Sequence, residues 1–244
     1  MRRLLIIESN EALVEEYKLL LDEHTNFHYK IVSSYEEAEK ALKQTRYEFG
    51  VTDINVPGAK EGVVIALMNR YNLAPIIFTD SIDEDFQEAY ESAQIVAYIL
   101  KESNDILSVI KKLNQLERNK KSTLLVVDDS ILHANFIKQN LILHKFKVLT
   151  AANGKLALEK LKNHPEIDFV VTNHRMKEMD GLELTQKIRQ LKETQKLPIL
   201  ALTSDADAAS NFLSEGVSDY LTKPFSRDDF YAKVYENMGT RELL

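Results

Sequence analysis

The stretch FGVTDINVP, residues 49–57, decides the fold because it joins an apolar run to one carboxylate, Asp53, and then breaks at Pro57. A short apolar run without alternating polar residues is typical of a strand buried on both faces of a parallel sheet. A second copy, FVVTNHRM, occupies residues 169–176 and has Asn173 where the first copy has the aspartate. The chain therefore carries the same strand signal twice, once with an acid and once with an amide.

Around this stretch, the first half of the chain alternates short apolar runs with amphipathic segments. In the longer segments apolar residues recur at three- and four-residue spacing, which predicts helices. The expected strands are residues 4–7, 29–32, 49–52, 76–79 and 95–100. The expected helices are a segment ending near residue 23, then residues 35–45, 63–71, 83–92 and 106–116. Strand and helix thus alternate five times.

The whole pattern then starts again in the second half. The run LLVVDD at residues 124–129 repeats LLIIES of residues 4–9 after 120 residues, and Asn173 follows Asp53 by the same 120 residues. A period this long indicates two complete domains rather than a solenoid. With right-handed crossovers, the pattern predicts an α/β fold of two tandem flavodoxin-like, doubly wound domains. Each is expected to have a five-stranded parallel sheet in the order 2-1-3-4-5, flanked by five helices.

The charged tail ERNKK, residues 117–121, marks the boundary between the two halves. We expect a first domain over residues 1–118, a linker over residues 119–122 and a second domain over residues 123–244. The composition of the tail leaves open whether the linker is flexible or continues the preceding helix.

Composition limits the functional classes. Lysine and arginine number 31 against 38 acidic residues, and the resulting net charge of −7 argues against a nucleic-acid-binding surface. The chain has no cysteine, which excludes disulfides, thiolate zinc sites and thiol nucleophiles. No run approaches the roughly 18 apolar residues that a membrane span needs. We therefore expect a cytoplasmic protein that binds neither nucleic acid directly nor a membrane.

Polar side chains follow the expected strands at the ends that converge on one crevice in an open parallel sheet. In the first half these residues are Glu8, Ser9, Asp53, Thr79 and Lys101. In the second half they are Asp128, Asp129, Asn173, Thr203 and Lys223. Oxygen-bearing side chains and a lysine around a central acid suit a hard cation such as Mg²⁺ together with a phosphoryl group. An aspartate can also accept phosphate covalently.

Four motifs of the second half occur in a characteristic order: LLVVDD at residues 124–129, TNHRMKEMDG at 172–181, ALTS at 201–204 and DYLTKPF at 219–225. With these motifs and their counterparts, each half resembles a receiver domain of the bacterial two-component response regulators. The resemblance implies that an acidic pair binds Mg²⁺ and that the aspartate after the third strand is phosphorylated. It also implies that the threonine and the lysine bind the phosphoryl group, while an aromatic residue changes position.

Matched residue by residue, the resemblance assigns roles to particular positions. The implied phosphoacceptor is Asp53, with Thr79 and Lys101 beside it. The implied metal ligands are Glu8, Asp53 and the backbone of Asn55 in the first half, and Asp128 and Asp129 in the second. The implied switch residues are Thr79, Tyr98, Thr203 and Tyr220. The degenerate second site is Asn173 with Thr203 and Lys223.

The two halves depart from the family pattern in complementary ways. The first half keeps the nucleophile but has Glu8 and Ser9 as its acidic pair, Asp80 after the threonine, and Glu102 where proline would follow the lysine. Because Mg²⁺ tolerates little distortion of its octahedral shell, this pair is expected to bind it weakly. The second half keeps both acids but presents Asn173, whose amide is a poor nucleophile. We therefore expect no phosphoaspartate at that position.

The resemblance implies a signalling module in which a sensor histidine kinase, a phosphotransfer protein or a small phosphodonor phosphorylates Asp53. The second half would then be a pseudo-receiver used for homodimerisation or partner binding. In the family, such tandem receivers can precede an output domain such as a diguanylate cyclase. The alternative is a phosphorylation-independent interaction scaffold of two pseudo-receivers. A phosphatase of the haloacid-dehalogenase type would need a second acid two residues after Asp53, where the chain has Asn55. No separate enzymatic output domain is expected in this chain.

Overall fold

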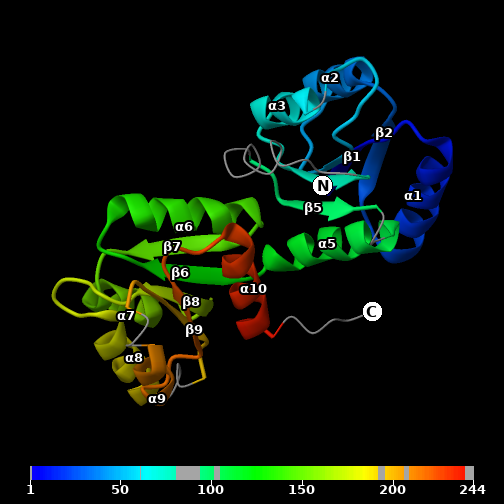
Figure 1. Cartoon of the computed structure of the whole chain (residues 1–244). Coiled ribbons are helices and arrows are strands. Elements are labelled where there is room, and N and C mark those ends of the chain that lie inside the picture. The colour runs from blue at the N-terminus through cyan, green and yellow to red at the C-terminus, as the bar shows by residue number, and fades with distance from the viewer. Residues whose placement is uncertain are drawn as a thin grey trace. The chain divides into compact units, whose positions relative to one another are not determined.

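The structure, a computed structural model, describes residues 2–60, 62–80, 94–101, 105–191, 196–205 and 209–239 (Figure 1). For residues 209–211 it describes the backbone alone. The chain separates into two compact units, and the division falls between Glu117 and Arg118. Each unit is one α/β domain.

Five short apolar runs form the sheet of the first domain. The strands are β1 (Arg3–Ile7), β2 (His28–Val32), β3 (Phe49–Thr52), β4 (Pro75–Thr79) and β5 (Ala97–Leu100). They pair in parallel in the order β2-β1-β3-β4-β5, which confirms the predicted order. Every residue of β3 and β4 is buried, as expected for central strands covered on both faces. Strand β5 begins two residues later than predicted, because the buried Ile95 packs in the core without belonging to the strand.

Two of the described helices of the first domain, the first two along the chain, begin at polar capping residues. The described helices are α1 (Glu11–His24), α2 (Tyr35–Gln44), α3 (Val63–Arg70) and α5 (Ile106–Asn119). The Asn10 side chain accepts hydrogen bonds from the backbone N–H groups of Ala12 and Leu13, and Ser34 caps α2 in the same manner. The helix predicted over residues 83–92 lies outside the described residues.

Helices cover both faces of this sheet (Figure 1). On one face, Ala38 of α2 and Val64 of α3 pack in a cluster with Leu5 of β1. On the other face, Tyr17 of α1 contacts Phe78 of β4 edge-on, with 6.4 Å between the ring centres. The alternating sides of the strands therefore bury two separate apolar layers.

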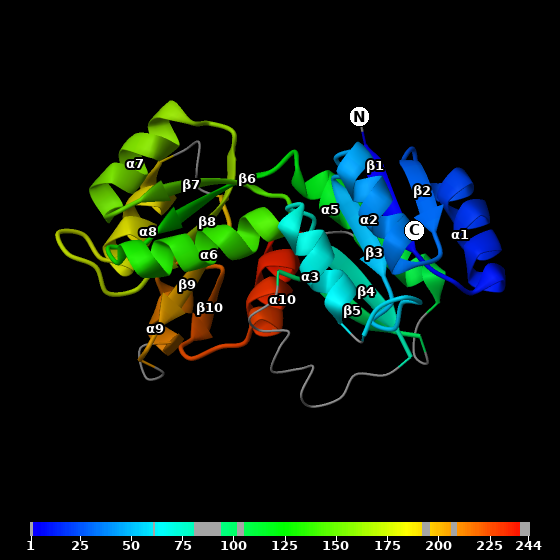
Figure 2. The same cartoon turned by 90° about the horizontal axis from the view of Figure 1, so that it is seen from above.

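The second domain repeats this architecture (Figure 2). Its strands are β6 (Thr123–Val127), β7 (Lys147–Ala151), β8 (Ile167–Asn173), β9 (Ile199–Thr203) and β10 (Asp219–Thr222). Its helices are α6 (Ile131–Leu143), α7 (Gly154–Asn163), α8 (Gly181–Gln190), α9 (Ala209–Ser214) and α10 (Arg227–Asn237). The sheet is again parallel, in the order β7-β6-β8-β9-β10, which is the predicted 2-1-3-4-5 topology.

Two hydrophobic clusters lie on opposite faces of the second sheet. Ile137 of α6 and Phe230 of α10 pack with Val126 of β6 on one face. Ala157 of α7 and Ile188 of α8 belong to the cluster on the other face. Among the described residues, no helix is long and apolar enough to cross a membrane.

The segment between the two sheets is mostly ordered secondary structure. Helix α5 ends at Asn119, three residues beyond the predicted end at Leu116. A turn follows, in which the backbone N–H of Lys121 donates to the carbonyl of Arg118. Asn119, predicted as the first linker residue, is 4% exposed, and its side chain donates hydrogen bonds of 2.8 Å and 2.9 Å within the second unit. The charged tail therefore consists of a helix end and a turn. Its amino-acid composition had left open whether it was helical or flexible.

Candidate functional site

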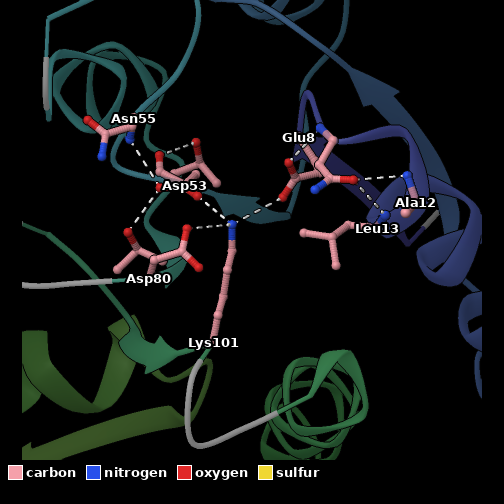
Figure 3. Close-up of polar contacts among 10 residues, drawn as sticks. Glu8, Ala12, Leu13, Asp53, Asn55, Asp80 and Lys101 are labelled. Atoms are coloured by element: carbon pink, nitrogen blue, oxygen red, sulfur yellow. Dashed lines mark hydrogen bonds and ion pairs between the residues drawn. The ribbon is translucent and has the colours of Figure 1, made fainter.

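Asp53 lies directly after β3 and is held by side chains from two other strands. Its Oδ1 accepts a hydrogen bond of 3.0 Å from Thr79 Oγ1, at the end of β4, and one of 3.1 Å from the backbone N–H of Asn55. Its Oδ2 accepts a bond of 2.5 Å from Lys101 Nζ, directly after β5. The carboxyl ends of parallel strands share one edge of the sheet. The residues that the sequence predicted to meet are therefore brought together (Figure 3).

Lys101 stands among three carboxylates in the same view (Figure 3). Its ammonium nitrogen lies 2.5 Å from Asp53 Oδ2, 3.7 Å from Glu8 Oε2 and 3.9 Å from Asp80 Oδ2. The Asp53 and Glu8 side chains are 12% and 6% exposed, whereas that of Asp80 is 79% exposed. One lysine thus faces three acids, and the excess negative charge favours binding of a further cation.

Glu8 occupies the site in the same manner as the shorter aspartate of the second domain. Its Oε1 accepts a hydrogen bond of 2.9 Å from the backbone N–H of Asn10, and its other oxygen faces Lys101. In the second domain, Asp128 Oδ1 accepts a bond of 2.8 Å from the backbone N–H of Ser130. Both acids are buried. The extra methylene of Glu8 therefore preserves the local backbone bond and moves the second oxygen toward the lysine.

The electrostatics of the first site favour a charged lysine. Burial pulls the pKa of Lys101 down, but the hydrogen bond to Asp53 and the charges of Glu8, Asp53 and Asp80 outweigh it, so the pKa lies above its usual value. The same negative charges act on the buried Tyr17. Its own burial, and then the negative charges of Glu8 and Asp53, raise the pKa of its hydroxyl well above the ordinary value. Tyr17 is therefore neutral beside these carboxylates.

The two tyrosines predicted as switch residues occupy equivalent strand positions. Tyr98 of β5 is half-buried and packs against the apolar cluster on the α2 and α3 face. Tyr220 of β10 is also half-buried and packs against Phe212 and Val217. Both tyrosines therefore belong to the strand that precedes the lysine, and both are partly exposed.

The corresponding site of the second domain is built around an amide that bonds in two directions. Lys223 Nζ donates a hydrogen bond of 3.1 Å to Asn173 Oδ1. Asn173 Nδ2 donates one of 2.8 Å to the backbone carbonyl of Arg175. Lys223 thus bonds to Asn173 as Lys101 bonds to Asp53. The other terminal atom of the Asn173 side chain, however, is a hydrogen-bond donor. The Asn173 amide has no negative charge, and its nitrogen is not nucleophilic. The position therefore has no counterpart of the carboxylate oxygen with which Asp53 can attack.

The sequence did not indicate how Thr203 is held. Its hydroxyl lies 3.2 Å from Nδ1 of His174 and accepts a hydrogen bond of 3.0 Å from the backbone N–H of Asp205. His174 is half-buried, and its ring contacts Phe212 edge-on. A comparison of the two halves could have pointed to this contact, because a polar histidine, His174, stands where the first domain has the buried, apolar Ile54. Thr203 therefore bonds with His174 and Asp205, whereas Thr79 donates to Asp53.

Mg²⁺ is the cation that the site chemistry implies, and the two domains fit it differently. In the first domain, one oxygen of Glu8 and one of Asp53 already converge on a single positive group, Lys101 Nζ. Two converging carboxylates with the nearby backbone carbonyl of Asn55 are the hard oxygen donors that Mg²⁺ prefers. These residues fit the ion, although in the described part of the chain no three acidic, histidine or cysteine side chains are arranged so that they alone could hold a metal ion.

In the second domain, the acids remain but their surroundings differ. Asp128 is buried, while Asp129 is exposed and accepts a bond of 3.3 Å from the backbone N–H of Lys177. The carbonyl of Arg175, the counterpart of the Asn55 backbone, is already bonded by the Asn173 amide. Two carboxylates are available there, but the third oxygen donor has a hydrogen-bond partner within the chain.

Comparison with known proteins places the second domain in a family. The family model described as the response regulator receiver domain matches residues 124–235. The chemotaxis protein CheY homolog of Campylobacter jejuni is 35% identical over 120 residues, which cover 48% of this chain and 92% of that protein. The chain belongs to the response regulator receiver family. The chain is also 35% identical over 131 residues to histidine kinase P4 of Formosa agariphila; the match covers 53% of this chain and 9% of that protein.

Two solved structures resemble both receiver domains together. They are described as a putative and a probable two-component system response regulator/GGDEF domain protein, with TM-scores of 0.83 and 0.81. Each alignment covers 98% of both chains, at 24% and 23% sequence identity. At that identity the likeness concerns the fold. Together with the family match and the two five-stranded sheets, it makes this chain a tandem receiver protein.

Proposed function

We propose that this tandem receiver is a phosphorylation-controlled module of two-component signalling, in which Asp53 of the first domain accepts a phosphoryl group. The observation that carries the proposal is the joint contact of the Asp53 carboxylate with Thr79 and Lys101, at 3.0 Å and 2.5 Å. A hydroxyl and an ammonium beside one carboxylate can bind the oxygens of a phosphoryl group once it is attached.

The proposed step is a displacement at phosphorus. One oxygen of Asp53 attacks the phosphorus of a phosphohistidine or of a small acyl phosphate, and an O–P bond forms. The P–N or P–O bond of the donor breaks, and its electron pair leaves with the imidazole or the carboxylate. Lys101 and Thr79 then bind oxygens of the new phosphoryl group, in place of the Asp53 carboxylate oxygens to which they were bonded before.

Mg²⁺, when bound by Glu8, Asp53 and the backbone carbonyl of Asn55, would neutralise charge on the phosphoryl oxygens. The residues of the chain supply the rest. Asp53 and Glu8 keep Lys101 protonated. Asp80 opposes the reaction, because its exposed carboxylate adds negative charge where the donor arrives.

The second domain is proposed to act as a pseudo-receiver that serves dimerisation or partner binding. The Asn173 amide removes the nucleophile, and its bond to the Arg175 carbonyl occupies a donor that a metal would use. The partner of the first domain is proposed to be a sensor histidine kinase or a phosphotransfer protein. We further propose a cytoplasmic location and, as in proteins with the same fold that are described as response regulator/GGDEF domain proteins, regulation of an output domain.

One labelling experiment tests the proposal. The protein is incubated with acetyl phosphate and Mg²⁺, and its intact mass is recorded beside that of Asp53→Asn and, as a matched control, Asp105→Asn. We expect a labile phosphoryl adduct in the wild type and in Asp105→Asn, and none in Asp53→Asn. The absence of any adduct over a full range of Mg²⁺ concentrations would refute phosphorylation of this domain.

A second candidate function is favoured by one specific observation. Lys101 pairs with both Asp53 and Glu8, so ion pairs within the chain already hold the phosphoacceptor carboxylate in place. The protein could then act as a phosphorylation-independent scaffold. The discriminating measurement is partner binding by the wild type and by Asp53→Asn, because a scaffold binds equally well in both forms.

A further inference from the structure

Helix α6 of the second domain carries an unusual surface. Ile131 and Leu132 are 76% and 81% exposed, Phe136 is 55% exposed and Ile142 is 41% exposed. Single exposed apolar residues are ordinary on protein surfaces, but a row along one helix is typical of an interaction site. Figure 2 shows this helix lying along the second sheet, with its length running beside the strands.

The outward side of α6 is defined here by six residues and is called the α6 outer face. These residues are Ile131, Leu132, Asn135, Gln139, Ile142 and Leu143. At 100° per residue they fall within one 120° arc, opposite the buried Ile137 and Leu141, and none of them is charged. Phe136 and Lys138 lie just outside the two margins of the same arc.

The equivalent helix of the first domain provides an internal comparison. On α1 the exposed positions are mainly charged, and they include Glu11, Glu15, Glu16 and Asp22. Leu19, 66% exposed, is the large exposed apolar residue that α1 presents among the described residues. The uncharged outer face is therefore a property of the second domain and does not follow from the shared fold.

The α6 outer face is symmetrical about Ile137. Ile131 and Leu143 lie six residues on either side of it, and Leu132 and Ile142 lie five residues away. Two antiparallel copies of α6 related by a two-fold axis at this residue would therefore place aliphatic side chains against aliphatic side chains at both ends. An isologous dimer requires this self-complementarity.

The polar members of the pattern obey the same symmetry. Asn135 and Gln139 lie two residues on either side of Ile137, so the amide of one copy would face the amide of the other and hydrogen-bond with it. Beyond the helix ends, Asp129 and Lys145 lie eight residues on either side, which brings opposite charges together. Aliphatic, amide and charged positions are thus all matched by one axis.

We propose that two copies of this protein associate through the α6 outer face, with the helices antiparallel and centred on Ile137. The inference deepens the proposed role of the second domain in dimerisation, and it does not depend on phosphorylation of Asp53. A helix of 13 residues is about 20 Å long. Such a strip is smaller than the roughly 800 Å² per partner of a standard interface, so the dimer is weak and depends on protein concentration.

The first test measures association. Sedimentation equilibrium of the whole chain over a range of concentrations is compared with that of Leu132→Glu and of the control Leu19→Glu, in which the 66% exposed leucine of α1 is changed. We expect a monomer–dimer equilibrium whose dissociation constant rises at least tenfold in Leu132→Glu and is unchanged in Leu19→Glu. Circular dichroism of all three proteins verifies that they are folded.

The second test measures orientation and uses the absence of native cysteine. Leu132→Cys and Ile142→Cys are prepared separately and oxidised alone and as a mixture. In the antiparallel dimer each cysteine lies about 15 Å from its own copy but opposite the cysteine of the other variant, within the Cβ separation of about 4 Å that a disulfide requires. We therefore expect a covalent dimer from the mixture and little from either variant alone.

The outcomes that overturn the proposal are distinct. A chain that stays monomeric at about 1 mM, far above the range of specific micromolar dimers, excludes self-association through this face. A dimer that persists unchanged in Leu132→Glu uses another surface, and cross-linking of each cysteine variant with itself shows parallel helices. The phosphorylation proposal is judged by labelling of Asp53 alone, so either proposal can fail while the other stands.

Discussion

The Asn173 amide donates a hydrogen bond of 2.8 Å to the backbone carbonyl of Arg175, two residues further along the chain. At the same place in the first domain the direction is reversed, because the Asp53 carboxylate accepts from the backbone N–H of Asn55 at 3.1 Å. The exchange of acid for amide therefore changes more than the nucleophile. It also turns a local acceptor into a donor that occupies an oxygen of the second site.

Restoring the acid in the second domain should restore reactivity only in part. In an Asp53→Asn background, Asn173→Asp is expected to give a new phosphoryl adduct with acetyl phosphate and Mg²⁺, because the change returns the nucleophile and frees the Arg175 carbonyl. Adding His174→Ile, the residue type at Ile54 of the first domain, should raise the labelling rate further by releasing Thr203. Intact mass against time measures both effects. Labelling in an Asn173→Ala control would show that another residue reacts.

The acidic pair of the first domain should limit its metal affinity. Glu8→Asp combined with Ser9→Asp adds a carboxylate and restores the shorter side chain, so the Mg²⁺ concentration needed for half-maximal labelling of Asp53 is expected to fall by about tenfold, or about 1.4 kcal/mol. Titration of Mg²⁺ at fixed acetyl phosphate measures it. An unchanged midpoint would mean that the metal site does not limit the reaction.

Asp80 should slow phosphorylation through its charge. Its carboxylate lies 3.9 Å from Lys101 Nζ and is 79% exposed, so Asp80→Asn is expected to raise the labelling rate of Asp53 by roughly two- to five-fold at low salt. The gain should shrink in high salt because exposed charges are screened. The exposed Asp105 provides a control, since Asp105→Asn removes one charge away from the three-acid cluster. A gain that does not depend on salt would contradict an electrostatic cause.

The raised pKa of Lys101 predicts a loss of stability in alkali. Burial alone would lower this pKa, but Asp53, Glu8 and Asp80 raise it above the ordinary value of 10.5. A group with a raised folded-state pKa stabilises fully below its unfolded pKa, and the stabilisation is lost as the pH rises through the folded value. The free energy of unfolding of the wild type should therefore exceed that of Lys101→Met at pH 8, and the difference should narrow above pH 10.5. Denaturant unfolding at each pH measures it, and a constant difference would contradict the coupling.

Asn119 should contribute to the stability of the second domain. It is buried, and its Nδ2 donates to the carbonyl of His144 and to the Tyr235 hydroxyl. Asn119→Ala leaves both acceptors without this donor and is expected to cost about 1–3 kcal/mol, measured by urea unfolding. Asn114→Ala, a change on the same helix where a half-buried side chain makes one bond to His24, should cost less. Equal losses would show that burial of Asn119 has no special weight.

Much of this protein could be predicted from sequence because its signals are periodic. Buried strands such as residues 49–52 read as continuous apolar runs, and the 120-residue repeat fixed two domains of one topology. The same strand order then required Asp53, Thr79 and Lys101 to share one edge of the sheet. These conclusions follow from chain connectivity and strand direction, which the sequence carries locally.

Tertiary structure alone decided the features that depend on how side chains orient across the fold. The sequence could not show that Lys101 bridges Glu8 and Asp53, that His174 engages Thr203, or that Asn119 is helical and buried. Each of these contacts joins residues that lie far apart in the chain, or depends on where a helix ends. The physical reason is that local pattern determines which face a residue occupies, whereas hydrogen bonds of about 3 Å depend on the positions of whole strands and helices.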